Sequence, residues 1–189
     1  MYPIEVFQTS LQKLVDVFRQ FGVRFHLTGG ITSVAYGEPR MTQDIDIVID
    51  RSVLATQSNE FLEVLQRRGF HLDKSSAKRA IETGDMFQVF DVDEALKIDL
   101  YPRELIPGEL SRSRVVEVFA GNHLPIASLP DVALSKLIWI DKGSHKSRRD
   151  LRQLLRRAND DETSTIRDGA TSFGLIELLD QVLSEPEEI

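Results

Sequence analysis

The chain has 189 residues, 41% of them hydrophobic, and a formal net charge of −7. This length fits one domain of ordinary size or a core domain with a helical appendage. Without cysteine there are no disulfides, thiolate metal sites or cysteine nucleophiles, and the four histidines show no zinc-ligand spacing, so we expect any metal to be held by oxygen. No apolar run reaches the roughly 18 residues of a membrane helix, and the first residues do not resemble a secretory leader. We therefore expect a cytoplasmic protein with no membrane partner.

The first third of the chain alternates between helical and strand patterns. Apolar residues at helical spacing predict a helix over residues 4–20. A short apolar segment, 23–27, predicts a strand that runs into Thr28-Gly29-Gly30, and small residues then predict a helix over 31–36. Acids that alternate with Ile and Val predict a strand over 44–50, and helical spacing returns over 52–68.

The rest of the chain changes from strands to helices. The segments 86–92 and 95–101 flank an acidic turn and predict an antiparallel pair, and 115–119 with 124–127 predict a hairpin. Three helices should follow, one starting at Pro130, a basic one over 144–158 and an apolar-faced one over 171–183. This order predicts an α+β fold with a mixed sheet flanked by helices. We expect a core domain over 1–129 and a helical C-terminal region over 130–189.

Two glycines stand between the predicted strand at 23–27 and the helix that follows. Because glycine has no Cβ, the backbone N–H groups of Gly29 and Gly30 can turn towards a ligand, and a helix N-terminus favours phosphate. Glycine pairs at such turns are mostly only turns, so this feature alone is weak support for phosphate binding.

Paired acids follow in Asp44-Ile45-Asp46-Ile47. The two-residue period of a strand puts both carboxylates on one face and both isoleucines on the other. Neighbouring carboxylates repel each other, and a cation such as Mg²⁺ between them removes the repulsion. A polar face of an exposed strand is the alternative, but it does not explain why that face is acidic.

A third carboxylate is available on the strand predicted over 95–101. Asp99 shares one face with Lys97 and Tyr101, and three carboxylates would suffice to bridge two Mg²⁺ ions if this strand lies beside the first. Asp91 and Asp93 form a rival pair with the same spacing. We favour Asp99 because its neighbours have the higher β propensity.

These residues together resemble a known signature. The glycine pair, a spacing of 13 residues and then Asp-Ile-Asp-Ile, with a later strand aspartate, is similar to the signature of the nucleotidyltransferase superfamily named after DNA polymerase β. The string LTGGITSVAYGEPRMTQDIDIVID looks most like the abortive-infection toxins of the AbiEii/AbiGii-like group, and also like small antibiotic nucleotidyltransferases. The resemblance implies the fold over about residues 20–130. Thr28 and Gly30 depart from the pattern, which often has an apolar residue and a serine at these two places.

The resemblance also implies roles for particular residues. Gly29 and Gly30 would take the phosphates of a nucleotide, and Asp44, Asp46 and Asp99 would be the catalytic metal ligands, with Asp99 also activating the acceptor. The metal would be Mg²⁺, two ions, with Mn²⁺ as the alternative. Further nucleotide-binding residues implied by the resemblance are Arg40, Thr42, Lys136, Lys146 and Arg149.

The segment 142–157 holds seven basic residues and one acid, in contrast to the acidic chain as a whole. A solvated helix face and a surface that contacts phosphate or polynucleotide are both consistent with this pattern. We expect His26, Trp139 and Phe173 to be interior residues.

The favoured function is Mg²⁺-dependent transfer of a nucleoside monophosphate from an NTP to an acceptor hydroxyl of tRNA or protein. A toxin–antitoxin setting, with a cognate antitoxin or toxin as partner, is implied by the resemblance alone. The alternatives are a small antibiotic as acceptor, and a catalytically silent nucleotide-binding or antitoxin-like module.

Overall fold

The computed structural model of the chain describes residues 4–36 and 44–186, which group into two compact units. Of the described residues, 4–32 and 44–127 form the first unit, and 33–36 with 128–186 form the second. Across this described part of the chain, every helix is too short or too polar to span a lipid bilayer. The first unit contains the sheet, and the second is helical.

A seven-stranded mixed sheet forms the centre of the first unit, in the order β3-β4-β5-β2-β1-β7-β6. The strands are β1 (Phe25–Thr28), β2 (Asp44–Ile49), β3 (Phe70–His71), β4 (Phe87–Asp91), β5 (Leu96–Tyr101), β6 (Arg114–Phe119) and β7 (Asn122–Ile126). Strand β2 runs parallel to β5 and antiparallel to β1, and β1 runs parallel to β7. The mixed α+β sheet that the sequence predicts is therefore confirmed.

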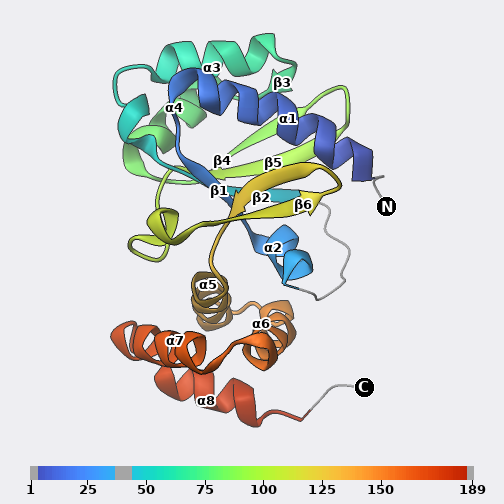
Figure 1. Cartoon of the computed structure of the whole chain (residues 1–189). Helices are drawn as coiled ribbons and strands as arrows, with labels where there is room; N and C mark the ends of the chain where they lie inside the picture. The colour runs from blue at the N-terminus through green and yellow to red at the C-terminus, as the bar shows by residue number, and fades with distance from the viewer. Residues whose placement is uncertain (1–3, 37–43, 187–189) are drawn as a thin grey trace. The chain divides into compact units, whose positions relative to one another are not determined.

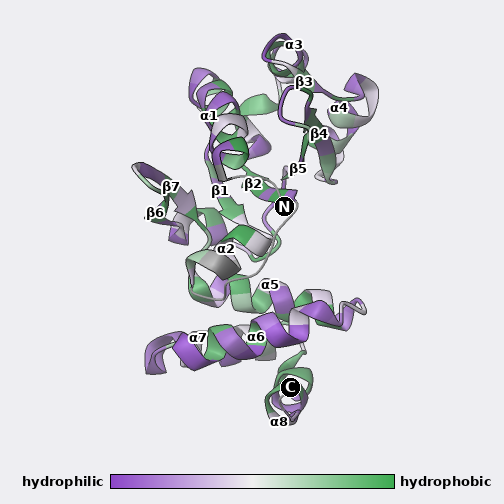
Figure 2. Ribbon diagram, turned by 90° about the vertical axis from the view of Figure 1, so that its right-hand side faces the viewer, coloured by the Kyte–Doolittle hydropathy of each residue, from purple (hydrophilic) through white to green (hydrophobic). Residues whose placement is uncertain are grey.

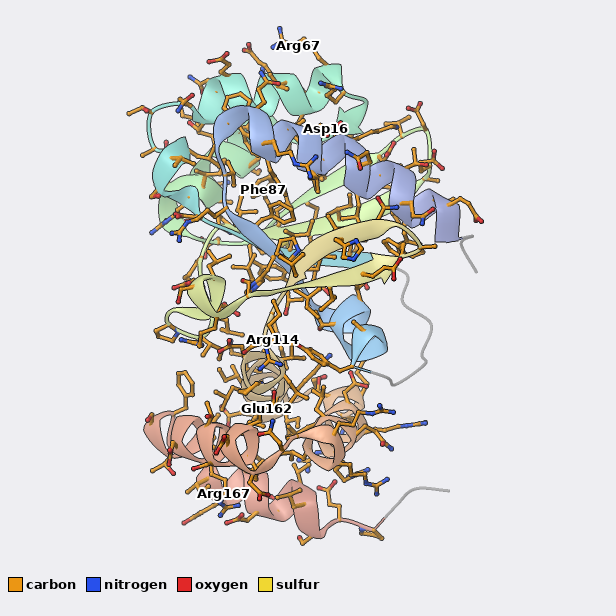
Figure 3. The ribbon with its side chains drawn as sticks, viewed as in Figure 1. Asp16, Arg67, Phe87, Arg114, Glu162 and Arg167 are labelled. Carbon is orange, nitrogen blue, oxygen red and sulfur yellow. The ribbon has the colours of Figure 1, made fainter. Side chains whose placement is uncertain are left out.

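Three helices cover one face of this sheet: α1 (Ile4–Phe21), α3 (Ser58–Arg67) and α4 (Lys74–Thr83) (Figure 1). Helix α1 carries both green apolar and purple polar stretches in Figure 2, as an amphipathic helix should. Its apolar side is fully buried at Leu14 and Phe18. Phe87 lies between the sheet and these helices, whereas Arg67, at the end of α3, points away from the sheet (Figure 3).

Two short 3₁₀ turns, η1 (Arg51–Leu54) and η2 (Glu109–Arg112), connect elements of the first unit. The short helix α2 (Gly29–Ala35) starts directly after β1 in the first unit, and its residues 33–35 belong to the second.

The helix predicted over 52–68 is wrong in its first part. Asp50 accepts a hydrogen bond from the backbone N–H of Ser52 and caps η1, and α3 begins only at Ser58. Leu54 in η1 and Phe61 in α3 are both fully buried, so apolar residues continue at helical spacing across the break. The sequence pattern therefore does not reveal where η1 ends and α3 begins.

From residue 128 onward, the described part of the second unit folds into four helices, α5 (Leu129–Asp141), α6 (Lys146–Arg157), α7 (Asp160–Ser172) and α8 (Ile176–Ser184). Ser128 caps α5 at the predicted start, with Pro130 in its first turn. A single last helix over 171–183 is wrong, because α7 ends at Ser172 and Gly174, at φ +68°, turns the chain before α8.

Candidate active site

The glycine turn lies where β1 passes into α2. Gly29 is the first residue of α2 and has a positive φ of +67°, a conformation that side chains other than glycine rarely adopt. A Cβ placed on Gly29 would lie 2.0 Å from Oδ2 of Asp46. The backbone at this turn therefore packs closely against Asp46, and only glycine permits that approach.

Strand pairing brings the carboxylates to one face of the sheet. Thr28 of β1 is the partner of Asp46 in β2, and Asp46 is in turn the partner of Asp99 in β5. Two residues earlier, Asp44 is the partner of Lys97. The isoleucines between the acids, Ile45 and Ile47, are fully buried on the opposite face, as the alternation requires. The structure thus brings together Gly29, Asp44, Asp46 and Asp99.

Lys97 supplies the positive charge within this acidic face. Its Nζ lies 3.0 Å from Oδ2 of Asp99, to which it donates a hydrogen bond, and 3.7 Å from Oδ2 of Asp44. Burial by itself would lower the pKa of Lys97, but the hydrogen bond and charge of Asp99, with the charges of Asp44 and Asp46, hold the pKa above its ordinary value. Lys97 is therefore a cation that offsets the repulsion between like charges on adjacent strands.

Asp46 and Asp99 differ in their remaining contacts. The hydroxyl of Tyr101 donates to Oδ1 of Asp46 at 3.2 Å. Burial, followed by the charges of Asp46 and Asp99, raises the pKa of Tyr101, so its hydroxyl stays protonated as a donor. In contrast, Oδ1 of Asp99 is buried and has no hydrogen-bond partner in the described structure. A buried carboxylate oxygen without a donor is suited to a cation.

The donors fit a hard divalent cation, although they do not form a closed cage. Three carboxylates on neighbouring strands are the oxygen ligands that Mg²⁺ prefers. Among residues 4–36 and 44–186, no three His, Cys, Asp or Glu side chains converge closely enough to hold a metal ion as they stand. The ammonium of Lys97 contacts Asp99 at 3.0 Å and lies 3.7 Å from Asp44, so it neutralises part of the charge of these carboxylates.

The rival carboxylates have another role. Asp91 is the partner of Leu96, so it lies on the helix-covered face of the sheet, opposite to Asp99. It is fully buried, accepts a hydrogen bond from Ser10 Oγ at 2.7 Å, and pairs with Lys13 of α1 at 3.1 Å. Lys13 also binds Asp93, at 2.9 Å. These two acids anchor α1 to the sheet.

The other residues singled out from the sequence lie elsewhere. Arg40 and Thr42 fall outside the described residues. Lys146 and Arg149 are exposed on α6 of the second unit. Lys136 of α5 is buried in that unit, and its Nζ lies 2.9 Å from Oδ2 of Asp150 on α6, so its ammonium is held by an internal carboxylate and does not extend to solvent.

The basic helix is not purely solvated. The guanidinium groups of Arg148 and Arg152 both bind the carboxylate of Glu185, which follows α8, and the Arg152 contact measures 2.7 Å. No local pattern indicates this contact, because Glu185 lies more than 30 residues away along the chain.

Of the three residues expected in the interior, one is there. His26 is fully buried, and its Nδ1 lies 2.8 Å from Ser113 Oγ. The prediction for Trp139 and Phe173 was wrong, since they are 41% and 38% exposed. Trp139 instead stacks against the ammonium of Lys142, 5.1 Å from the ring centre, so its outer face is covered by a cation.

Comparisons with solved structures place this geometry in a known fold. The solution structure of the antibiotic-resistance factor ANT(2'')-Ia matches with a TM-score of 0.61 and 13% identity, over 96% of this chain and 99% of that chain. An antigenic nucleotidyltransferase-like protein from Paracoccidioides brasiliensis matches with a TM-score of 0.56 and 14% identity, over 100% and 96%. The lincosamide antibiotic adenylyltransferase LnuA matches with a TM-score of 0.52 and 16% identity, over 79% and 97%. These likenesses confirm the predicted nucleotidyltransferase-like fold.

Sequence comparison identifies the family. No curated protein sequence matches the chain. The family model described as nucleotidyl transferase AbiEii toxin, type IV TA system, matches residues 12–178, which include the glycine turn, all three carboxylates and helices α5 to α7. The chain therefore belongs to the AbiEii family of nucleotidyltransferase toxins.

Proposed function

We propose that the chain transfers a nucleoside monophosphate from an NTP to a hydroxyl group of a tRNA or a protein, and that Asp44, Asp46 and Asp99 hold the Mg²⁺ required for the transfer. The observation that carries this proposal is the contact between Gly29 and Asp46, together with the direct pairing of Asp46 and Asp99. It supports a phosphate-binding turn and metal-binding carboxylates within one site.

Each group in this site has a task that its chemistry suits. The backbone N–H groups of Gly29 and Gly30 would bind the triphosphate at the start of α2. Asp99, whose Oδ1 lacks a partner within the described structure, would accept the proton of the attacking hydroxyl. Two bound Mg²⁺ ions, or Mn²⁺ in their place, would neutralise the triphosphate and favour ionisation of that hydroxyl. We assign Arg40, Thr42, Lys146 and Arg149 to further phosphate contacts, but not Lys136, because Asp150 already holds its ammonium.

Family membership implies a nucleotide substrate and an antitoxin partner. The identity of the acceptor is tested by incubating the chain with each radiolabelled NTP and Mg²⁺ in the presence of total tRNA, total protein, or panels of aminoglycosides and lincosamides. Label on tRNA or protein supports the proposal, whereas label confined to an antibiotic contradicts it.

The metal site is tested by Asp44→Asn and Asp46→Asn. Each change removes a charged oxygen ligand while keeping the shape of the side chain, so we expect each to abolish binding of Mg²⁺-NTP with the fold intact. Calorimetry measures the affinity, and circular dichroism checks the fold. Asp16→Asn is the matched control, because Asp16 lies on α1 at the protein surface. Unchanged affinity in both site variants would rule out this assignment.

A further inference from the structure

The outer edge of β4 is largely unpaired. Strand β3 has two residues, and they pair only with the end of β4, at Asp91 and Phe90. Within the described part of the chain, no strand lies beside the outer edge of residues 87–89, since β4 is followed in the sheet only by β3. Such an edge presents backbone N–H and C=O groups that can pair with another extended chain.

A groove with a volume of about 720 Å³ follows this edge. It runs between β4 and the start of α4, where Ser76 and Ala77 line it, and Met86, Gln88 and Phe90 line the β4 side. Met86 and Phe90 are large apolar residues that are 43% and 40% exposed. A bound ligand would therefore cover apolar surface that is now in contact with water.

The groove continues onto the carboxylate face. Gln88 is the partner of Asp99 and Phe90 is the partner of Lys97, so both side chains point to the same face as the acids. Lys97 lines the groove and also donates to Asp99. A ligand in the groove would therefore lie next to the carboxylate that the proposed function assigns to the acceptor hydroxyl.

The lining indicates what kind of acceptor fits. Its charged residues, among those that the structure describes, are one lysine, Lys97, and one aspartate, Asp73. A polynucleotide would need several cations for its phosphates, and this groove does not offer them. An extended polypeptide needs what the groove does offer, namely a free strand edge and apolar contacts for alternate side chains.

We propose that this groove binds an extended segment of an acceptor protein, added as a strand to the edge of β4, and that a residue flanking this strand places its Ser, Thr or Tyr hydroxyl at Asp99. This inference rests on the proposed function and makes its acceptor a protein. The hydroxyl oxygen forms a bond to the α-phosphorus of the NTP, and the bond from that phosphorus to the oxygen bridging the α- and β-phosphates breaks. Pyrophosphate leaves, and Asp99 takes the hydroxyl proton.

The test uses the full chain and an array of short synthetic peptides, each with one Ser, Thr or Tyr among alternating apolar residues. The array is measured once for bound fluorescent protein without NTP, and once for label transferred from each radiolabelled NTP with Mg²⁺. Ser76→Trp fills the groove from exposed α4, and Met86→Glu places a charge in it. Val115→Glu is the control, because Val115 is 69% exposed on β6, the other edge of the sheet.

We expect the unchanged chain to bind and label a subset of peptides. Both groove variants should weaken peptide binding about tenfold or more, because the indole of Ser76→Trp occupies the space of the peptide and Met86→Glu replaces an apolar contact with a charge. Their Mg²⁺-NTP affinity, measured by calorimetry, should not change, and Val115→Glu should keep both activities. Hydrogen exchange should show that the best peptide protects residues 87–89 and leaves 114–119 unprotected.

Three results would overturn the inference: no peptide is bound, binding survives both groove variants, or tRNA is labelled in preference to every peptide. Failure of the proposed function gives a different result, because the unchanged chain would then transfer label from no NTP to tRNA or protein. In that case the peptide-binding measurement, which uses no nucleotide, still decides whether the groove takes a strand.

Discussion

At Gly29 the main chain approaches the carboxylate of Asp46 more closely than any side chain would allow. Two separate requirements meet at this residue, a positive φ of +67° and the lack of room for a Cβ. Many glycines satisfy only the first. Gly121, in the turn between β6 and β7, has φ +77°, and nothing lies within 4 Å of where its Cβ would be.

Gly29→Ala and Gly121→Ala separate these two requirements. Both variants should lose about 1 kcal/mol of unfolding free energy from the strained backbone. Only Gly29→Ala should also lose Mg²⁺-NTP binding, because its methyl group would displace the Asp46 carboxylate. Urea unfolding and calorimetry measure the two effects. If both variants bind Mg²⁺-NTP as the unchanged chain does, contact between the turn and Asp46 has no role in binding.

A second prediction concerns Asp99. Asp99→Asn should keep much of the NTP affinity, which depends more on the glycine turn and the first two acids, but should lower turnover by about 10²- to 10⁴-fold. Single-turnover kinetics and calorimetry on the same variant separate the two quantities. Equal turnover would remove Asp99 from the reaction. Asp91 could not act as the third carboxylate in its place, because it is buried on the opposite face of the sheet against Lys13.

The residues of the carboxylate face could be found from the sequence because their pattern is local. In a strand, acids two residues apart point to the same face, and a glycine at the strand end allows a turn, whatever the rest of the fold. Lys97 was placed on the correct face, but its position between Asp44 and Asp99 depends on the register of β2 with β5. The positions of the exposed Gln88 and Phe90 on this face depend likewise on the register of β4 with β5. No local pattern in the sequence predicts these positions.

At the scale of elements, α1 is attached to the sheet by polar as well as apolar contacts. Its Ser10 and Lys13 satisfy the fully buried Asp91 of β4. Burial by itself would lower the pKa of Lys13, but hydrogen bonds and charges from Asp93 and Asp91 outweigh it and raise that pKa. A buried carboxylate that loses its cation is costly, so this pair should matter for stability.

Lys13→Met should lower the free energy of unfolding by about 2 to 3 kcal/mol at neutral pH, less than a fully buried pair because Lys13 is partly exposed. The pKa of Lys13 is raised on folding above its ordinary 10.5, so its contribution is fully present below that pH and is lost as the pH rises through the folded value. Urea unfolding should therefore show the two proteins converging above about pH 10.5.

Arg19→Met is the control for this prediction, since Arg19 pairs with Asp16 on the same helix at 3.6 Å and both are exposed. Exposed pairs contribute about 0 to 1 kcal/mol. A Lys13→Met variant no less stable than this control would show that Asp91 does not need its cation.

Periodicity predicted most elements but not all of them. Helix α4 was missed because its buried residues, Ala77, Ala80 and Ile81, are mostly small and make a weak apolar stripe. Its boundaries were nevertheless marked, by Asp73 as N-cap and by Gly84 in the left-handed conformation after it. Strand β3 has only two residues, which is too short for any period, and its pairing with β4 exists only in the folded chain.

At the scale of the whole molecule, charge argues against a general affinity for nucleic acid. The chain carries a net −7, and its one strongly basic segment lies in α6. Two arginines of that helix, Arg148 and Arg152, already share the carboxylate of Glu185. A carboxylate held by two guanidinium groups occupies the same donors that a phosphate would use.

Glu185→Gln tests whether this internal carboxylate limits binding of polyanions. Releasing two guanidinium groups should raise the affinity for total tRNA and should steepen its salt dependence, by about 0.7 to 0.9 of a log unit per log unit of salt for each new phosphate contact. Fluorescence anisotropy over a series of salt concentrations measures both.

Glu177→Gln is the control, since Glu177 is an exposed acid on α8 and its loss changes the net charge equally. If the two variants behave alike, the effect is one of total charge and not of Arg148 and Arg152. If Glu185→Gln binds tRNA no better than the unchanged chain, Arg148 and Arg152 do not contact nucleic acid even when their internal carboxylate is neutralised.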